Sequence, residues 1–115
     1  FTVGWTDESD PQHVYLYSYD VNGEPVGQKR AVSADESSSL RGSDEIEMAE
    51  LTDGSLAAVW EATASGNQDI YGRVLATSLP VFGELSSIAK LNSVDSGAQI
   101  NPGIASLPDN RFVMV

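Results

Sequence analysis

Three carboxylates near the start of the chain are the residues with the clearest potential for metal chemistry. Asp7, Glu8 and Asp10 lie within four consecutive positions. Their hard oxygen atoms are the ligands that Ca²⁺ prefers, so they form the candidate metal site, and Ca²⁺ is the one cofactor that the sequence suggests. The spacing differs from that of an EF-hand loop, and the matching loop at 61–68 has a single acidic residue, Glu61. A solvated acidic loop is therefore the favoured interpretation.

A second acidic group lies in the middle of the chain, at Asp44, Glu45, Glu47 and Glu50. On a strand, Glu45 and Glu47 would point to the same face because side chains alternate. A pair of carboxyl groups can supply the acid and the base of a glycosidase. However, any two neighbouring residues on one strand face lie near the required separation. We therefore expect a polar, exposed strand face here.

The other reactive side chains form no catalytic pattern. His13 is the only histidine, and the sequence has no cysteine, no G-x-S-x-G motif and no glycine-rich phosphate loop. We expect His13 simply to open a strand. The prediction is that the chain has no catalytic residue and is not an enzyme.

Aromatic residues are the candidates for ligand binding or for packing. Four of them recur at equivalent points of the two halves of the chain: Trp5, Trp60, Tyr15 and Tyr71. This recurrence favours a role in packing between repeats. Tyr17 and Tyr19 have no aromatic counterpart in the second half. They are the candidate ligand-binding residues, since their rings could stack on sugars.

These residues belong to a tandem repeat of about 56 residues. The segment LTDGSLAAVW at Leu51–Trp60 returns as LPDNRFVMV at Leu107–Val115. A fixed period of this kind indicates a repeat architecture. The predicted division is a first repeat at 1–54, and a second repeat at 55–115 that ends with the first strand of a third. We expect the chain to be part of a longer array.

Each period contains four short apolar runs separated by turn residues, which predicts strands and little or no helix. The predicted strands are Phe1–Trp5, His13–Tyr19, Lys29–Ser33, Glu45–Leu51, Ser55–Trp60, Asp69–Leu75, Ser86–Leu91 and Pro102–Leu107, with a ninth beginning at Arg111. Asn22-Gly23 predicts a type I′ hairpin turn, because both residues tolerate a positive φ. Gly54 and Asn110 are predicted to take the left-handed position of two further turns.

The predicted fold is all-β and propeller-like, with two tandem four-stranded antiparallel repeats. The strand that carries the tryptophan is apolar on both faces, which indicates a strand covered by layers on both sides. Four-stranded sheets that stack face to face are the blades of a β-propeller. A β-sandwich is the alternative. Two blades cannot close a ring, so the predicted partners are neighbouring repeats or further copies of the same chain.

Over nearly its whole length, and most clearly at Leu91–Val115, the chain resembles the acidic tandem repeats of large secreted bacterial proteins, the RTX-like and hemolysin-type adhesins and related surface proteins. The matching positions are Asn92, Gly97, Gln99, Pro102, Ile104, Ala105, Leu107 and Asp109, with Tyr71–Arg73 and, in the first half, Tyr19–Asp20, Asn22–Gly23 and Pro25–Gly27. The resemblance implies a propeller-like array in an extracellular protein, often beside calcium-binding nonapeptide repeats. Those nonapeptides are absent here, so calcium ligands are not carried over to any residue.

The composition of the chain argues against two classes of binding partner, nucleic acid and membranes. The chain has 17 acidic and 6 basic residues, a formal net charge of -11, which repels nucleic acid and anionic membranes. No apolar run is long enough to insert into a membrane. We therefore expect a non-catalytic repeat module of an extracellular or cell-surface bacterial protein, acting in adhesion or as a scaffold. The alternatives are a carbohydrate-binding propeller assembled from several chains and, third, a glycosidase-type propeller enzyme.

Overall fold

The computed structural model describes residues 1–7, 13–34, 41–64, 66–77, 82–84 and 86–115. Within these residues it contains ten β-strands and no helix, so the prediction of an all-β fold is confirmed. Every strand pairing is antiparallel, and none of the sheets closes on itself. In the described part of the chain there is no helix that could cross a membrane.

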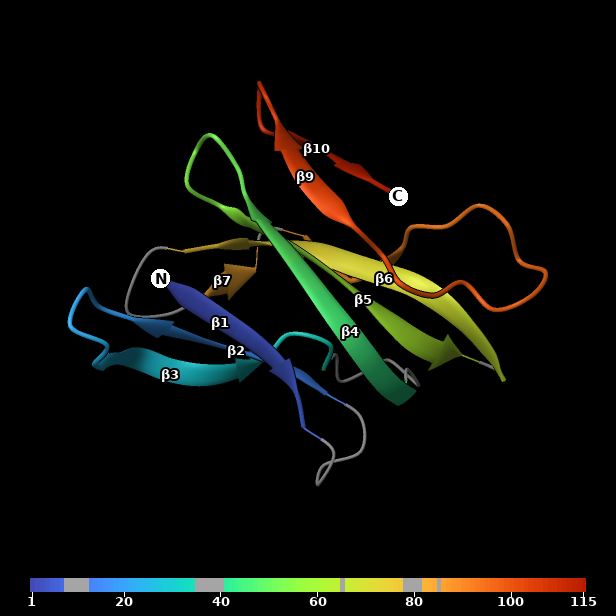
Figure 1. The fold of residues 1–115 in the computed structure, drawn as a ribbon, viewed down its shortest axis with the longest axis horizontal. Coiled ribbons are helices and arrows are strands. Elements are labelled where there is room, and N and C mark those ends of the chain that lie inside the picture. Colours follow the sequence, from blue (N-terminus) through green and yellow to red (C-terminus); the bar gives the residue numbers. More distant parts are fainter. Residues whose placement is uncertain (8–12, 35–40, 65, 78–81, 85) are drawn as a thin grey trace.

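The described strands form three sheets (Figure 1). The first sheet contains β1 (Thr2–Thr6), β2 (Val14–Tyr19) and β3 (Pro25–Ala31). The central sheet contains β4 (Arg41–Glu50), β5 (Leu56–Ala64), β6 (Asn67–Ala76), β7 (Gly83–Glu84) and β8 (Ala89–Lys90). The third sheet is the hairpin of β9 (Ile104–Leu107) and β10 (Arg111–Met114). Both β7 and β8 pair with β6, so they occupy one edge of the central sheet.

β5 lies inside the molecule because it is apolar on both faces. Leu56, Ala58 and Trp60 point to one face, and Ala57 and Val59 point to the other. All five side chains are buried. This agrees with the prediction that the tryptophan strand is covered by layers on both sides.

One predicted turn is wrong. Of Asn22 and Gly23, only Gly23 has a positive φ, at 81°, so the turn is not of type I′. The loop is longer and is organised by the Asp20 carboxylate, which accepts hydrogen bonds from the N–H groups of Asn22 (2.8 Å) and Glu24 (2.9 Å). Aspartate stabilises turns in this way without the mirror-image geometry. The left-handed conformations predicted for Gly54 (φ 83°) and Asn110 (φ 57°) are confirmed.

Several predicted strands differ in extent. β3 begins at Pro25 rather than Lys29, β4 begins at Arg41 rather than Glu45, and β5 continues to Ala64 rather than ending at Trp60.

Of the predicted strand at 86–91, only Ala89–Lys90 forms a strand, as β8. The N–H of Ser86 donates to the Val74 oxygen at 3.2 Å, but the N–H of Val74 donates to the Ser86 Oγ at 2.8 Å and the Ser86 backbone oxygen accepts from Arg73, so the regular ladder is interrupted there. The predicted strand at 102–107 begins only at Ile104. Pro102 has no N–H to donate to a ladder.

The hydrogen-bonded sheets do not coincide with the two repeats predicted from the sequence. The predicted first repeat, 1–54, ends with β4, yet β4 pairs with β5 of the predicted second repeat. By position in the repeat, the three strands of the first sheet are equivalent to β5, β6 and β7 of the central sheet. The two strands of the third sheet are equivalent to β4 and β5. Because a periodic chain can be cut at any point of its period, the division into 1–54 and 55–115 stays a prediction.

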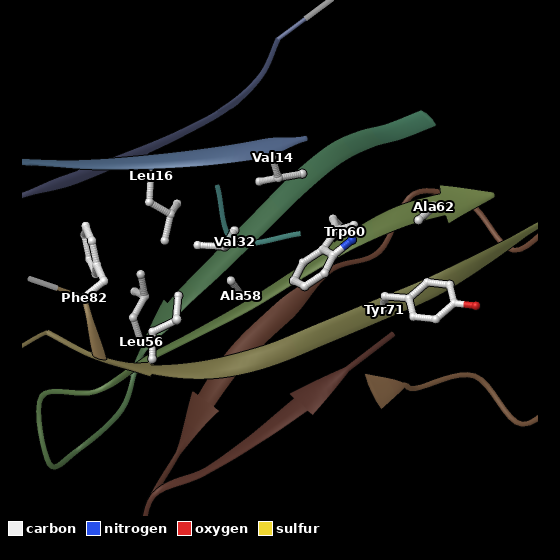
Figure 2. Close-up of a cluster of buried hydrophobic side chains, with 10 residues drawn as sticks. Val14, Leu16, Val32, Leu56, Ala58, Trp60, Ala62, Tyr71 and Phe82 are labelled. Carbon is white, nitrogen blue, oxygen red and sulfur yellow. The ribbon is translucent and has the colours of Figure 1, made fainter. Parts of the chain in front are cut away.

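The core lies between the first sheet and the central sheet (Figure 2). The buried hydrophobic residues of this core are Val14, Leu16, Val32, Leu56, Ala58, Trp60, Ala62, Tyr71, Leu75 and Phe82. β1 comes close to β4 beside this core: a Cβ atom on Gly4 would lie 3.0 Å from Leu16 Cδ2 and 3.0 Å from Met48 Cε. Glycine at this position permits the close approach of the two sheets.

The third sheet lies against β4 on the side away from the first sheet (Figure 1). Along β10, Phe112 and Met114 are half-buried, whereas Val113 is exposed. This alternation indicates that Phe112 and Met114 face the central sheet. The three sheets therefore follow one another in chain order, each covering part of the next.

Candidate functional site

The first sheet carries a row of aromatic side chains on the face that turns away from the central sheet. In the pairing of β1 with β2, Val3 lies opposite Tyr17 and Trp5 lies opposite Tyr15. Residues that lie opposite each other in an antiparallel pair share a face. We call this surface the Trp5 face and define it by Phe1, Val3, Trp5, Tyr15, Tyr17 and Tyr19.

The rings of the Trp5 face are in contact with one another. Phe1 stacks on Tyr19 with ring centroids 5.4 Å apart and an interplanar angle of 15°. Trp5 stacks on Tyr15 at 5.9 Å and 27°. Tyr17 extends the first pair, since its ring lies 5.4 Å from that of Tyr19. The rings therefore form two groups on one face, Phe1 with Tyr19 and Tyr17, and Trp5 with Tyr15.

Tyr15 is buried although it belongs to this outer face, because its neighbours cover it. The Lys29 ammonium nitrogen lies 3.9 Å from the centroid of the Tyr15 ring. The His13 ring meets Tyr15 edge-on at 6.3 Å. Towards the other end of the face, Phe1 is 70% exposed and Val3 is 41% exposed. The open part of the Trp5 face is thus its Phe1, Val3, Tyr17 and Tyr19 region.

The central sheet has an equivalent face, and there it is covered. Trp60 lies opposite Tyr71, in the same register as Trp5 and Tyr15. We call this surface the Trp60 face and define it by Leu56, Ala58, Trp60, Tyr71, Arg73 and Leu75. The first sheet packs on it, and Trp60 is 0% exposed. Its Nε1 has no hydrogen-bond partner among the described residues.

Two arginines join the sheets across this interface. Arg73 of the central sheet is buried and donates from Nη1 to the backbone oxygen of Val32 at 3.2 Å, and from Nη2 to that of Ser86 at 3.1 Å. Arg30 of β3 donates to the backbone oxygen of Phe82. Buried carbonyl groups need such partners. The interface is therefore fixed by directed bonds as well as by apolar packing.

The structure brings the candidate ligand-binding residues Tyr17 and Tyr19 together on the Trp5 face. They occupy the positions that Arg73 and Leu75 hold on the Trp60 face. Their assignment as ligand-binding residues stays a prediction, as does the packing role of Trp5 and Tyr15. Arg73 was missed by sequence reasoning, because a charged residue within an apolar strand gives no signal of burial on its own.

The predicted calcium site lies mostly outside the described residues. Only Asp7 is described, and its backbone N–H bonds to the His13 oxygen at 3.4 Å. Glu8 and Asp10 fall in the part that the structure leaves undescribed. Among the residues that it does describe, no group of three or more acidic or histidine side chains is placed to hold a metal ion. The calcium prediction stays untested.

The described members of the middle acidic group are exposed side chains of β4. Ile46 and Met48 lie opposite Trp60 and Ala58, on the Trp60 face, while Glu47 is exposed on the other face. Glu45 sits at an irregularity of β4 with φ 39° rather than in a regular strand. Glu45 and Glu50 are also exposed. The side chain of Asp44 lies outside the description.

His13 begins the segment that leads into β2 and contacts a buried serine. Its Nδ1 lies 3.5 Å from the Oγ of Ser33. That hydroxyl also accepts a hydrogen bond from the N–H of Val14 at 2.8 Å, and Ser33 is 1% exposed. A hydroxyl that is buried and held in this way helps to secure the start of the strand.

A hollow of about 460 Å³ opens between the first and central sheets. Its lining residues are Phe1, Thr2, Ser18, Tyr19, Met48, Glu50, Gly54, Leu56 and Thr77. The hydroxyl groups of Thr2 and Ser18 are 2.9 Å apart and bond to each other, and Thr77 bonds to the Gly54 oxygen. These hydroxyls are already engaged within the protein, so the hollow offers few convergent polar groups to a ligand.

A polar cluster holds the long segment that follows β8. The Asn92 side chain donates to Asp69 Oδ1 at 2.8 Å and accepts from the N–H of Ile70 at 2.8 Å. Lys90 Nζ lies 3.0 Å from Asp69 Oδ2. The hydrogen bond from Asn92, followed by that from Lys90, lowers the pKa of Asp69. This cluster is structural, since its carboxylate is occupied by an amide and an ammonium group.

No protein-family model, curated protein or solved structure matches this chain.

Proposed function

We propose that the chain is a stacking repeat of a propeller-like array, a non-catalytic scaffold or adhesion module of an extracellular bacterial protein. The observation that carries this proposal is the equivalence of two faces. Trp60 lies opposite Tyr71 on neighbouring strands, just as Trp5 lies opposite Tyr15. The Trp60 face is buried beneath the sheet that precedes it in the chain. Apolar faces of successive repeats therefore act as mutual contact surfaces.

The sheet order supports a propeller-like unit. The central sheet runs β4, β5, β6 and then β7 with β8 at one edge, which is a meander of four strand positions. The first sheet matches the last three positions, and the third sheet matches the first two. A β-sandwich consists of two sheets. A succession of three sheets favours a repeating array, in which each unit stabilises its neighbours.

The same equivalence favours stacking over sugar binding as the main role. The positions of the Trp5 face that are open to solvent have counterparts on the Trp60 face that pack against protein. The aromatic rings of the Trp5 face could also stack on a sugar, so a glycan is the competing ligand for this surface. The acidic composition and the resemblance to secreted repeat proteins support the extracellular assignment.

A fusion of two copies tests the proposal. If Val115 of one copy is followed directly by Trp5 of a second, the 56-residue period continues without interruption. We expect the fusion to unfold in one cooperative transition, at a higher urea concentration than the single chain, because each additional interface stabilises both neighbours.

The matched control joins Val115 to Gly4, which inserts one residue at the junction. A shift of one residue turns every side chain of a strand to the opposite face. We expect this control to unfold like the single chain. Equal unfolding midpoints for the single chain and the continuous fusion would contradict the proposal.

A further inference from the structure

Two faces of the three described sheets are not covered by another described sheet. The Trp60 face is covered by the first sheet, and Phe112 and Met114 of the third sheet turn towards the central sheet. The Trp5 face belongs to the first sheet and has the composition and register of a covered face. At the other end of the stack lies the outer face of the third sheet.

This outer face carries apolar side chains and one charged side chain, Arg111. Val113 lies opposite Ala105, and Arg111 lies opposite Leu107, so these side chains point away from the central sheet. Val113 is 44% exposed and Val115 is 88% exposed. We call this surface the tail face and define it by Ala105, Leu107, Val113 and Val115.

We infer that the Trp5 face binds the tail face of a second copy of this chain, so that copies associate head to tail. The inference rests on the proposed function and extends it from contacts within one chain to contacts between chains. Among the described residues, five of the eight exposed large hydrophobic side chains lie on these two faces: Phe1, Val3, Leu107, Val113 and Val115.

Continuity with the interfaces inside the chain identifies the occupant. Within the chain, the face equivalent to the Trp5 face always turns towards the sheet that comes before it. A tail face of a second copy continues this order, because within the described chain no later sheet covers the third sheet. The contact is heterologous, since it joins two different surfaces, and it leads to a ring or to an open chain of copies.

In this association, the free energy of the apolar contacts must exceed the electrostatic repulsion between the two copies. Each copy has a formal net charge of -11, so two copies repel each other at low ionic strength. The side chains that define the two faces are alanine, valines, leucine and aromatic residues rather than ion-pairing groups, and Arg111 is the charged residue that shares the tail face with them. Added salt therefore strengthens the association, whereas an interface held by ion pairs would weaken.

The test uses one variant for each face. Val3→Lys places a charge on the Trp5 face, and Val113→Lys places one on the tail face. Val21→Lys is the matched control, because Val21 is 97% exposed and lies in the loop between β2 and β3. The association of each protein is measured by sedimentation over a range of concentrations, and the fold of each is checked by circular dichroism.

We expect the unchanged chain and Val21→Lys to associate with increasing concentration. Val3→Lys and Val113→Lys should each raise the apparent dissociation constant at least about tenfold, the effect of losing roughly 1.4 kcal/mol of contact free energy. Mixed in equal amounts, the two variants should form a defined dimer, because one retains an intact tail face and the other an intact Trp5 face.

Three outcomes would overturn the inference. The chain could remain monomeric up to about 1 mM, the weakest range of measurable association. Val113→Lys could associate like the unchanged chain, which would indicate a symmetric contact between two Trp5 faces. Finally, a monomer whose tryptophan emission shifts on addition of oligosaccharide would show a glycan on this face. A fusion that gains stability while separate copies stay monomeric would refute only this inference and leave the proposed function standing.

Discussion

The side chain of Asn110 bonds to Asp53, which occupies the equivalent hairpin turn of the preceding sheet. Asn110 Oδ1 accepts the N–H of Asp53 at 2.8 Å, and Asn110 Nδ2 donates to Asp53 Oδ2 at 2.9 Å. Thr52 also bonds to Asn110. The turn between β9 and β10 is thereby attached to the turn between β4 and β5. This contact orients the third sheet against the central one.

Replacing Asn110 by glycine should weaken this attachment without straining the backbone. Asn110 has φ 57°, and glycine adopts this conformation freely. We expect Asn110→Gly to lower the free energy of unfolding by about 1 kcal/mol, the net value of a hydrogen bond. A double-mutant cycle with Asp53→Ala isolates the pair, and additive effects of the two changes would show that they are not coupled.

Replacing Arg73 by methionine should destabilise the interface between the first and central sheets. The change retains much of the apolar stem but leaves the oxygens of Val32 and Ser86 without this donor. An unsatisfied buried carbonyl costs about 1–3 kcal/mol. Chemical denaturation of Arg73→Met should therefore show a loss of about 2 kcal/mol or more. The exposed Arg111, changed to methionine in the same way, is the control and should lose little.

Stability should depend on pH through Asp69. Its pKa is lowered in the folded chain, first by the hydrogen bond from Asn92 and then by Lys90. A lowered folded pKa gives stability that is present above the unfolded pKa of about 4 and is lost as pH falls through the folded pKa. Urea midpoints measured from about pH 6 to pH 2 should fall more steeply for the unchanged chain than for Asp69→Asn. Asp109→Asn alters an exposed carboxylate and serves as the control. If the urea midpoint of Asp69→Asn fell with pH as steeply as that of the unchanged chain, Asp69 would not be a cause of the pH dependence.

Periodicity made the strand register predictable from the sequence. Trp5 and Tyr15 recur as Trp60 and Tyr71, and the structure pairs each couple in the same way. The left-handed conformations of Gly54 and Asn110 were also predictable, because few residues other than glycine and asparagine adopt them readily. These features depend on local chemistry that the sequence displays directly.

Contacts between distant side chains were not predictable in this way. Arg73 is a charged residue in an apolar strand, and its partner Val32 acts through a backbone oxygen that no sequence pattern marks. The bond between Asp53 and Asn110 joins two turns that would each form alone. The strand predicted at 86–91 forms only at Ala89–Lys90, because the hydroxyl of Ser86, rather than a backbone oxygen, accepts the N–H of Val74.

The central claim, that repeats stack through their tryptophan faces, is tested most directly by the accessibility of the two tryptophans. In Trp5→Phe, only Trp60 remains, and its emission should be blue-shifted and resistant to acrylamide quenching because it is 0% exposed. In Trp60→Phe, Trp5 should be quenched more readily at concentrations where the chain is monomeric. When the second copy of the continuous fusion carries the only tryptophan, as Trp5, its emission should become as shielded as that of Trp60. A Trp5 that stays equally accessible in the single chain and in the fusion would contradict the account.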